Sequence, residues 1–186
     1  GRAFESLAAE GAFAAVLDFA PQEVGNHLFG SAITAGAGRM TSAGAKGGPQ
    51  LVSIGCYDLV DLVGWHPLPA HLEGLPGHAH NRLLSSVVLD GEVRRKVARA
   101  MMDKLAAPKG DVVFLLPTRG GNEWDREGGP LCDAEGLAAF VAEVRAACPP
   151  NVRLVELEAH INDPAFAEAA LAVVDGWIAE GRLPPA

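Results

Sequence analysis

The sequence has 186 residues, of which 49% are hydrophobic and 20% are charged, and its net charge is −8. This length and balance are typical of one globular domain with a proper core, and they exclude disordered and collagen-like chains. The acidic balance argues against nucleic acid and anionic membranes as partners, because both attract clustered lysine and arginine.

The amino-terminal part predicts a helix, a strand and a second helix. Apolar residues at helical spacing occupy positions 4–8, and Gly11 suits the end of that helix. Residues 13–19 form an apolar run that predicts a strand. Pro21 then suits the first turn of a helix that runs to about Leu28.

The middle of the chain is irregular between further strands. Residues 30–48 are rich in glycine, and residues 50–54 predict a strand that ends at Gly55. Residues 64–82 hold four histidines and three prolines without periodicity, which predicts a long loop of the kind that often carries function. Strand character returns over residues 83–89.

The next segment predicts a long helix and then the most apolar strand of the chain. Asp90 is a suitable N-cap, and apolar residues recur at helical spacing from Val93 to Leu105. The run 112–116 is apolar throughout, which is typical of a strand buried on both faces in a parallel sheet. Pro117 lacks a backbone donor and is expected to end the pairing of that strand.

The carboxyl-terminal part predicts two helices around a last strand. Asp133 caps the first helix, residues 151–158 predict the strand, and Asp163 with Pro164 begins the final helix. The predicted buried face of the final helix is Phe166, Ala170, Leu171, Val174, Trp177 and Ile178.

Strands that alternate with helices predict an α/β fold. We expect residues 1–186 to form a single three-layer Rossmann-like domain, with a mainly parallel sheet and helices on both faces. The strands expected to share this sheet are 13–19, 50–54, 83–89, 112–116 and 151–158.

The cysteines and the ends of the chain bear on its location. Cys56, Cys132 and Cys148 are far apart and lack CxxC spacing, so they are interpreted as reduced thiols of a cytoplasmic protein. No apolar run approaches the roughly 20 residues that cross a bilayer. The chain begins with Gly1 and has no signal-peptide pattern, and we expect it to be a piece of a longer protein.

Two candidate features lie near the first two strands, at the carboxyl edge of the sheet where ligands bind in open α/β folds. Asp18 closes the first strand. In the segment from Thr34 to Arg39, Gly36 and Gly38 allow backbone N–H groups to face an anion. The segment matches neither a Walker P-loop nor the Rossmann glycine fingerprint, and plain loop flexibility is the alternative.

A third feature follows the strand 112–116. Arg119 could hold a carboxylate or phosphate through two parallel hydrogen bonds, in the polar loop with Gly120. The alternative is a surface arginine paired with Asp125 or Glu127.

The fourth feature is the segment from His160 to Pro164. Asn162 or Asp163 is expected to cap the final helix, with a side-chain oxygen accepting from a backbone N–H near Phe166. His160 could also point from the strand end into the site as an acid, a base or a ligand. Both interpretations stay open at this point.

Four histidines in the loop 64–82 raise the question of a metal. His78 and His80, two residues apart, could share a metal ion if the segment is extended. Solvent-exposed loop histidines are the alternative for both, and for His66 and His71. No carboxylate stands at a recognisable offset, so no metal site is predicted.

Several blocks of the sequence occur in a recognisable order. They are Thr34–Gly44, Pro49–Ser53, His80-Asn81, Phe114–Pro117 with Gly120, and above all His160-Ile161-Asn162-Asp163-Pro164-Ala165-Phe166-Ala167. Together they resemble the Tm-one-like ATP-binding family, named for the tomato mosaic virus resistance protein. The resemblance covers almost the whole chain.

This resemblance implies a protein of two Rossmann-like halves, of which the chain matches the carboxyl-terminal one. It implies ATP as a cofactor of the full-length protein and the amino-terminal half as the partner of this domain. The plant member also suggests a protein-interaction role. The resemblance supplies no catalytic residue.

We therefore expect a ligand-binding module that closes with an amino-terminal half over a nucleotide or other phosphorylated small molecule. The alternatives are a metal- or acid/base-dependent enzyme using Asp18, His80, His160 and Asp163, and a protein-interaction domain; a homo-oligomer is compatible with each. The candidate ligand-binding residues are Asp18, Thr34, Gly36, Gly38, Arg39, Ser53, His80, Asn81, Arg119, Gly120, His160 and Asp163. Of these, Thr34, Gly36, Ser53, Arg119 and His160 are expected to lie in one cleft.

Overall fold

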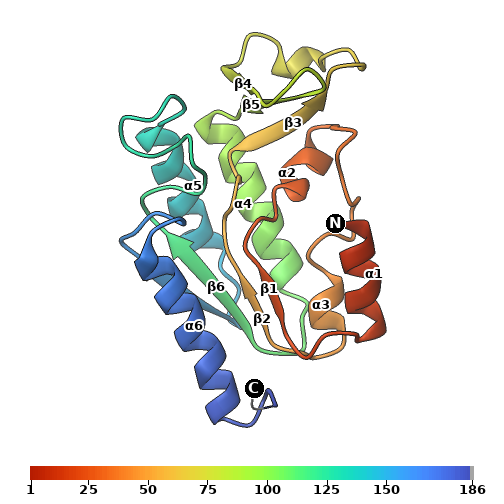
Figure 1. Cartoon of the computed structure of the whole chain (residues 1–186), viewed down its shortest axis with the longest axis vertical. Coiled ribbons are helices and arrows are strands. Elements are labelled where there is room, and N and C mark those ends of the chain that lie inside the picture. The colour runs from red at the N-terminus through yellow and green to blue at the C-terminus, as the bar shows by residue number, and fades with distance from the viewer. Residues whose placement is uncertain (185–186) are drawn as a thin grey trace.

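A four-stranded parallel sheet forms the centre of the computed structural model, which describes residues 1–184 (Figure 1). The strand order is β1-β2-β6-β7. Its strands are β1 (Val16–Asp18), β2 (Gln50–Val52), β6 (Val112–Pro117) and β7 (Val152–Leu157). Four of the five predicted strands therefore pair as expected, and β6 pairs with β7 along its full length.

Alternate residues of β6 point to opposite faces of the sheet, as the period of an extended strand requires. Phe114 and Leu116 pack on the face covered by α4 (Gly91–Leu105) and α5 (Ala134–Ala147). Val113 and Leu115 pack on the other face, against α6 (Pro164–Ala179). Helices thus cover both faces, and the expected three-layer α/β fold is confirmed.

Three of the predicted helix ends agree with the structure. Gly11, with a φ of 78°, ends α1 (Arg2–Glu10) in the left-handed conformation. The side chains of Asp90 and Asp133 accept hydrogen bonds from Val93 and Gly136 in the first turns of α4 and α5. Two short helices, α2 (Glu23–Leu28) and α3 (Ser42–Ala45), lie with α1 beside the β1 edge (Figure 1).

The strand predicted at 83–89 was placed in the wrong sheet. It is β5 (Leu84–Val88), and it pairs antiparallel with β3 (Leu59–Val63) and β4 (Gly77–Ala79) in a separate three-stranded sheet, order β3-β5-β4. This small sheet lies beyond the carboxyl ends of the central strands (Figure 1). The chain enters it directly from β2 through Ser53-Ile54-Gly55, with no helix to return it to the central sheet. A parallel connection needs such a crossover, so antiparallel pairing with a close neighbour results.

The loop predicted over residues 64–82 is also more ordered than expected. It contains strand β4 and a short 3-10 helix, Ala70–Leu72. Leu72 is buried and packs in the same core cluster as the strands of the small sheet. A three-residue strand and a single buried leucine are too short to produce a hydrophobic periodicity in the sequence, so neither element could be predicted.

Of the six residues predicted for the buried face of α6, three are buried, Val174 and Ile178 are half-buried, and one is exposed. Phe166, Ala170 and Trp177 are buried and Val174 packs beside them, but Leu171 is 62% exposed. Val173 takes the buried position instead, because the helix turns a narrower stripe toward the sheet than the apolar sequence suggests.

Two compositional expectations concern thiols and membranes. The three cysteines are free. Within residues 1–184, no helix is both long and apolar enough to cross a membrane.

Candidate functional site

Arg39 lies in a buried cluster with three carboxylates, beside the first strand. Its guanidinium is paired with Asp18 through both terminal nitrogens, the Nη2–Oδ1 distance being 2.7 Å. Nη1 also donates to Glu5 Oε1 (3.2 Å) and Nε to Glu23 Oε2 (2.9 Å). Burial acts to lower the pKa of Arg39, but the hydrogen bonds and charges of Asp18 and Glu23 raise it overall, so the side chain stays charged.

The glycine-rich segment does present backbone donors to an anion, and that anion is Glu5. Glu5 Oε1 accepts from the N–H of Met40 (2.6 Å) and Oε2 from that of Ser42 (3.2 Å). Gly36 has a φ of 84° and donates to Thr34 Oγ1 within the turn. The predicted anion site around Gly36, Gly38 and Arg39 is therefore filled by carboxylates of the protein itself.

Two more predicted residues have structural partners away from any shared cleft. Ser53 is fully buried and its hydroxyl donates to Leu115 O (2.8 Å), which ties β2 to β6. Asn81 Oδ1 accepts from the backbone N–H groups of Leu83 and Leu84, as in an Asx turn.

The histidines belong to the small sheet and its surroundings. His80 Nε2 lies 2.8 Å from Ser86 Oγ, which donates to Asp61 Oδ1 (2.7 Å). The rings of His78 and His80 pack against Trp124, with centroids 4.4 and 4.9 Å away. His66 and His78 line a cavity of about 650 Å³ between the small sheet and the loop after β3, while His71 Nε2 lies 3.2 Å from Phe29 O. In the part of the chain that the structure describes, no group of three or more His, Cys, Asp and Glu side chains could hold a metal ion.

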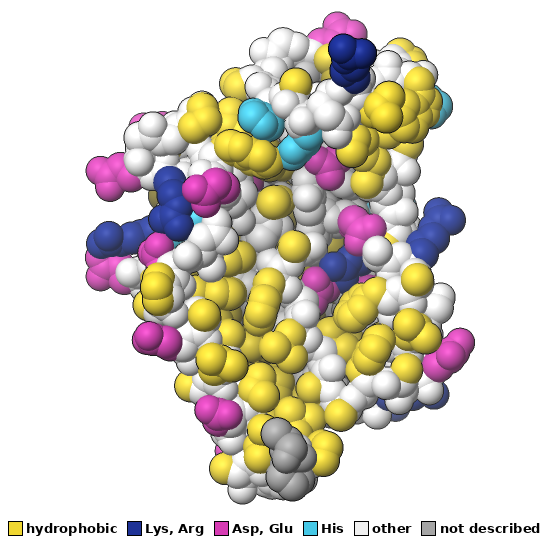
Figure 2. Space-filling view, viewed as in Figure 1, with side chains coloured by type: hydrophobic (Ala, Val, Ile, Leu, Met, Phe, Trp, Pro, Cys, Tyr) yellow, Lys and Arg dark blue, Asp and Glu magenta, His cyan; other side chains and the backbone are white. Residues whose placement is uncertain are grey.

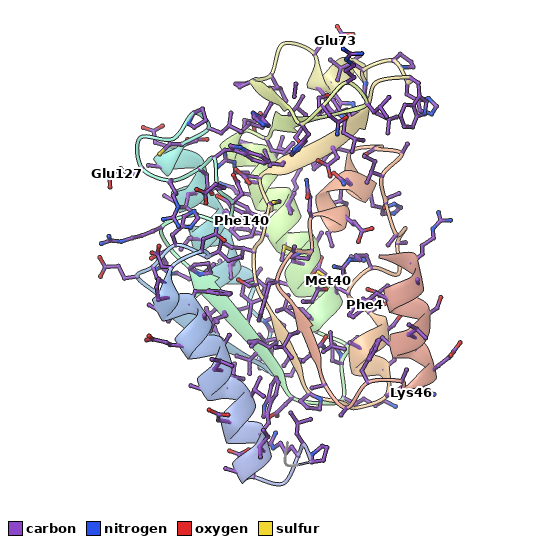
Figure 3. All side chains as sticks on the ribbon, viewed as in Figure 1. Phe4, Met40, Lys46, Glu73, Glu127 and Phe140 are labelled. Atoms are coloured by element: carbon purple, nitrogen blue, oxygen red, sulfur yellow. The ribbon has the colours of Figure 1, made fainter. Side chains whose placement is uncertain are left out.

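A second cavity, of about 550 Å³, lies where the central strands β6 and β7 end. Arg119, His160 and Asp163, all expected at the site, line it together with Thr118. Thr34, Gly36 and Ser53 are not among its lining residues, so the prediction of one cleft holding all five residues is wrong. In Figure 3, Glu127, which lines the cavity, lies at the left flank of the molecule, well away from Met40, the neighbour of Arg39 in the chain, which lies near the middle of the view.

Arg119 contacts a different partner from those expected. Its Nη2 donates to Glu158 Oε1 (2.6 Å), and not to Asp125 or Glu127. Both members of the pair are mostly exposed, at 61% and 81%, so a ligand could displace Glu158 at little free-energy cost.

Both ring nitrogens of His160, which is 2% exposed, are used within the protein. Nε2 lies 2.8 Å from Asn122 O and 2.9 Å from Asp125 Oδ1, and only a protonated Nε2 can satisfy these two oxygens. Nδ1 accepts from the N–H of Asn162 (3.1 Å). The ring therefore joins the loop after β6 to the loop after β7, and no nitrogen is left for a substrate.

Gly120 is required by the same contact. Its φ is 129°, and a Cβ there would lie 2.5 Å from Asp125 Oδ1 and 2.6 Å from His160 Cδ2. At the neighbouring Gly121 a Cβ would lie 2.8 Å from Ile54 O. The two glycines let the loop pass between β2 and the His160 ring.

Asp163 is the N-cap residue of α6, with Pro164 in the first turn as predicted, but its side chain does not cap the helix. Oδ2 accepts from the backbone N–H of His160 (2.8 Å), and Oδ1 from Arg126 Nη1 (3.1 Å). These two hydrogen bonds lower the pKa of Asp163. The prediction of an N–H near Phe166 as donor is wrong for the side chain, because Phe166 donates to the backbone oxygen of Asp163.

The inner wall of this cavity contains residues that sequence reasoning missed. Arg94 is 1% exposed; its Nε donates to Leu89 O (2.7 Å) and its guanidinium lies over the ring of Tyr57, 5.7 Å from the centroid. One sequence signal could have found it, since Arg94 stands three residues before Val97 on the apolar stripe of its helix. It also places a positive charge in the first turn, against the helix dipole.

Asp58 lies behind this wall and is fully buried. Asn122 Nδ2 donates to its Oδ1 (2.9 Å), but its Oδ2 has no hydrogen-bond partner. Burial, and then the charge of Asp125, raise the pKa of Asp58 to about 6, against the opposing effect of Arg94. Burial likewise raises the pKa of the neighbouring Cys56 thiol to about 12, so it is an unreactive thiol.

The enzyme alternative needs four residues that the structure keeps apart. Asp18 is paired with Arg39, His80 belongs to the small sheet, and His160 has both nitrogens engaged. Only His160 and Asp163 share a cavity. These contacts leave no acid/base pair among the four residues.

Almost the whole chain is similar to known proteins. The carboxyl-terminal domain of an uncharacterised protein family, UPF0261, matches residues 1–178. A UPF0261 protein of Brucella melitensis is 47% identical over 181 residues, which are 97% of this chain and 43% of the relative. A UPF0261 protein of Mesorhizobium japonicum is 30% identical, over 94% of this chain and 45% of the relative.

A plant protein is also similar. The ToMV resistance protein Tm-1 of Solanum lycopersicum is 28% identical over 96% of this chain, which corresponds to 24% of that protein. The chain spans less than half the length of these relatives.

Proposed function

Since this chain belongs to the uncharacterised protein family UPF0261, as a carboxyl-terminal domain with Tm-1-like relatives, we propose that it is a ligand-binding module. It closes with an amino-terminal half over a nucleotide or other phosphorylated small molecule. The resemblance inferred from the His160–Ala167 block is confirmed by these relatives, whereas ligand binding is our proposal.

One observation carries the proposal: the cavity at the ends of β6 and β7 is lined by three arginines, Arg94, Arg119 and Arg126. Cavities at the carboxyl ends of parallel strands are the usual ligand sites of α/β sheets. A volume of about 550 Å³ is within the range of small-molecule sites. Arginine suits phosphate because its planar group donates two parallel hydrogen bonds.

We propose an anion site at the β6–β7 side of the sheet edge and not at the β1 side. Arg39 supports no ligand, because Asp18, Glu5 and Glu23 already accept its hydrogen bonds. Figure 2 shows basic and acidic side chains intermingled on the flank where Figure 1 places the loop after β6.

The amino-terminal half is proposed as the partner because the relatives are more than twice as long as the matched region. Exposed apolar side chains near the first strand support a surface that the amino-terminal half would cover, since Phe13 is 40% and Leu17 46% exposed. Figure 2 shows hydrophobic side chains gathered over the sheet and α6 on this face. ATP remains a possible cofactor of the full-length protein by resemblance, and we expect this chain alone to bind it weakly or not at all.

We also propose a cytoplasmic location, without a nucleic-acid or membrane partner. The net charge of −8 supports both exclusions, and the three free thiols support a reducing compartment. We also propose a homo-oligomer, which size-exclusion chromatography tests, and a protein-interaction role, which a pull-down experiment tests.

Titration calorimetry with ATP and a monophosphate, on this chain and on its full-length polypeptide, tests the proposal. Arg119→Gln is expected to weaken binding by roughly tenfold, the value of a charge-assisted hydrogen bond. Arg145→Gln is the matched control, because Arg145 is also mostly exposed, at 54% against 61% for Arg119, and pairs with Glu156 of β7 outside this cavity. Equal affinity of wild type and both variants, or no binding by the full-length protein, would contradict the proposed function.

A further inference from the structure

We propose that the sheet face beside α6 and across β1 is the docking surface for an amphipathic helix of the amino-terminal half of the full-length polypeptide. This β1–α6 face is formed by Leu17, Phe19, Leu171, Val174 and Ile178. The identity of the partner rests on the proposed function, whereas the place and the kind of segment follow from the face itself.

Side chains in one row across the sheet differ in burial from strand to strand. Leu17 of β1 stands beside Leu51 of β2, which stands beside Val113 of β6. Leu51 and Val113 are 0% and 1% exposed, because α6 packs on them, whereas Leu17 is 46% exposed. At the opposite edge the row ends in Arg153, an exposed residue that water solvates. Parallel sheets are normally covered on both faces, so the apolar β1 end of this row lacks its cover.

The two flanks of α6 differ in the same way. On the flank toward β7, Ala169 and Gly176 line a cavity together with polar and charged residues of the neighbouring strands. Successive residues of a helix turn by about 100°, which places Leu171, Val174 and Ile178 on the opposite flank. Leu171 is 62% exposed, and Val174 and Ile178 are half-buried. An apolar stripe at helical spacing that stays partly exposed indicates that another element packs against it.

The apolar strip of β1 adjoins this flank of α6. Ala15 and Phe19 pack in the cluster beneath α6, and Leu17 lies between them in the alternation of the strand. Phe19 also packs edge-on against Phe166 of α6, with ring centroids 5.3 Å apart. Figure 2 shows hydrophobic side chains gathered over this part of the sheet and α6. The face therefore fits an apolar protein surface and not a charged ligand.

The spacing of the elements leaves room for one helix. α6 packs on Leu51 of β2 and on Val113 and Leu115 of β6. Neighbouring strands lie about 4.8 Å apart and packed helices about 8–10 Å apart, so a helix beside α6 would lie over β1. A helix with one apolar side would cover Leu17 and the exposed flank of α6, and its polar side would face water.

The size of the relatives and the position of the chain end favour the amino-terminal half as the source of this helix. The matched family domain is the carboxyl-terminal one, and it covers 43% of the Brucella relative, so the larger part of that protein precedes it. Gly1 lies on the side of the molecule where α1 and β1 lie, where a preceding segment would join (Figure 1). Phe166 follows Asp163 of the β6–β7 cavity by three residues, so one partner can cover the face and close the cavity.

Cysteine labelling of the full-length polypeptide tests the docking. Leu171→Cys places a thiol on the face, and Ala172→Cys, the matched control, places one at an exposed position of α6 that points away from the face. We expect iodoacetamide to alkylate Leu171→Cys at least about tenfold more slowly than Ala172→Cys, because a packed surface reacts only when it opens locally. Mass spectrometry of the α6 peptide measures both rates. Equal rates would overturn the docking.

Leu171→Glu gives a second readout, since glutamate is well accepted on a helix surface. A charge in an apolar interface is unfavourable, so the melting temperature of the full-length polypeptide should fall by roughly 4 °C or more. Ala172→Glu adds the same charge to the same helix and should melt as wild type does. If the two variants melted alike, the face would be a solvent-exposed surface and the proposal wrong.

A second copy of the chain is the other occupant that these experiments identify. Protection by the amino-terminal half of the same polypeptide does not depend on protein concentration, whereas protection by a second copy decreases on dilution. Protection that is lost on dilution, or a dimer that Leu171→Glu splits into monomers in size-exclusion chromatography, would overturn the proposed occupant.

Failure of the docking and failure of the proposed function are distinguishable. If Leu171→Cys reacts as fast as the control in a full-length protein that binds a phosphorylated probe, the docking is wrong and the ligand-binding module is not. If the thiol is protected in a full-length protein that binds no phosphorylated probe, the docking holds and the module is overturned.

Discussion

Arg39 and Arg94 are both buried arginines, 4% and 1% exposed, and they differ in how far the protein satisfies them. Arg39 donates to Asp18, Glu5 and Glu23. Arg94 has a single short hydrogen bond, to Leu89 O, one long contact to Tyr57 and one nitrogen without a well-directed acceptor. Hydrogen bonds therefore satisfy the guanidinium of Arg39 more fully than that of Arg94, whose Nη2 lies 2.9 Å from Asp133 Oδ2 without a well-directed hydrogen bond.

The comparison shows that residue type and burial do not by themselves identify a binding residue. Around Arg39, three carboxylates and two backbone donors hold α1, β1 and the glycine-rich segment together. Around Arg94, the protein supplies one backbone oxygen, that of Leu89, and one carboxylate, that of Asp133, at the wall of a cavity. The two arginines therefore differ in how many of their hydrogen bonds the protein itself completes.

The largest effect is expected for Arg39→Gln. Removing the positive member of a buried cluster leaves uncompensated carboxylates, which typically costs about 3–5 kcal/mol of the free energy of unfolding. Urea denaturation should show this loss, and Arg94→Gln should lose less, since fewer of its hydrogen bonds are made. If the two variants were equally stable, the contrast between the arginines would be wrong.

Asp58→Asn is expected to stabilise the protein at neutral pH. The folded state keeps the Asp58 proton up to a pKa of about 6, whereas the unfolded chain releases it near 3.8. Between these values the folded state binds more protons, so the free energy of unfolding falls as pH rises. The difference corresponds to up to about 3 kcal/mol, which the asparagine variant should recover above pH 6.

Urea melts of wild type and Asp58→Asn between pH 4 and 8 measure this difference. Asp103→Asn, at an exposed carboxylate of α4, is the control and should track the wild type. A constant gap between Asp58→Asn and wild type across this pH range would show that Asp58 titrates normally.

Gly120→Ala tests the frame of the cavity. The added methyl group would enter a φ of 129° and lie within 2.6 Å of both Asp125 and His160, so the loop must shift. We expect a loss of about 1–3 kcal/mol from backbone strain and overpacking. Gly128→Ala is the control. Gly128 also has a positive φ, of 78°, but its Cβ would meet no atom within 4 Å, so this variant measures the backbone strain without the clash. A wild-type melting temperature for Gly120→Ala would mean that the loop is looser than its contacts indicate.

The smallest effect is expected for Asp163. Asp163→Ala removes the acceptor of the His160 N–H and of one Arg126 hydrogen bond, and should lower the melting temperature slightly. Asp163→Asn keeps an acceptor oxygen and should be close to wild type in thermal unfolding. If the asparagine variant is as stable as wild type but binds the monophosphate probe differently, the Asp163 charge acts on the ligand. Equal destabilisation of both variants would show that its charge holds the loop.

Much of the fold could be predicted because its signals are local. The strands 112–116 and 151–158 and the caps at Asp90 and Asp133 follow from apolar runs, helical spacing and side chains that bond within one turn. The strand at 83–89 was recognised but misplaced, since its partner is set by the path of the chain after β2 and not by its own residues.

The sequence by itself determined the elements, the family resemblance and the sheet edge at which polar loops gather. Only the tertiary structure decided which polar groups are free. Arg39 meets Glu5 and Asp18 across 34 and 21 residues, and His160 meets Asp125 across 35. Such contacts depend on how distant elements pack, and no spacing pattern encodes them. The predicted anion site at Gly36–Arg39 was therefore filled from within, whereas Arg94, in a helix that gave no motif, reaches the cavity.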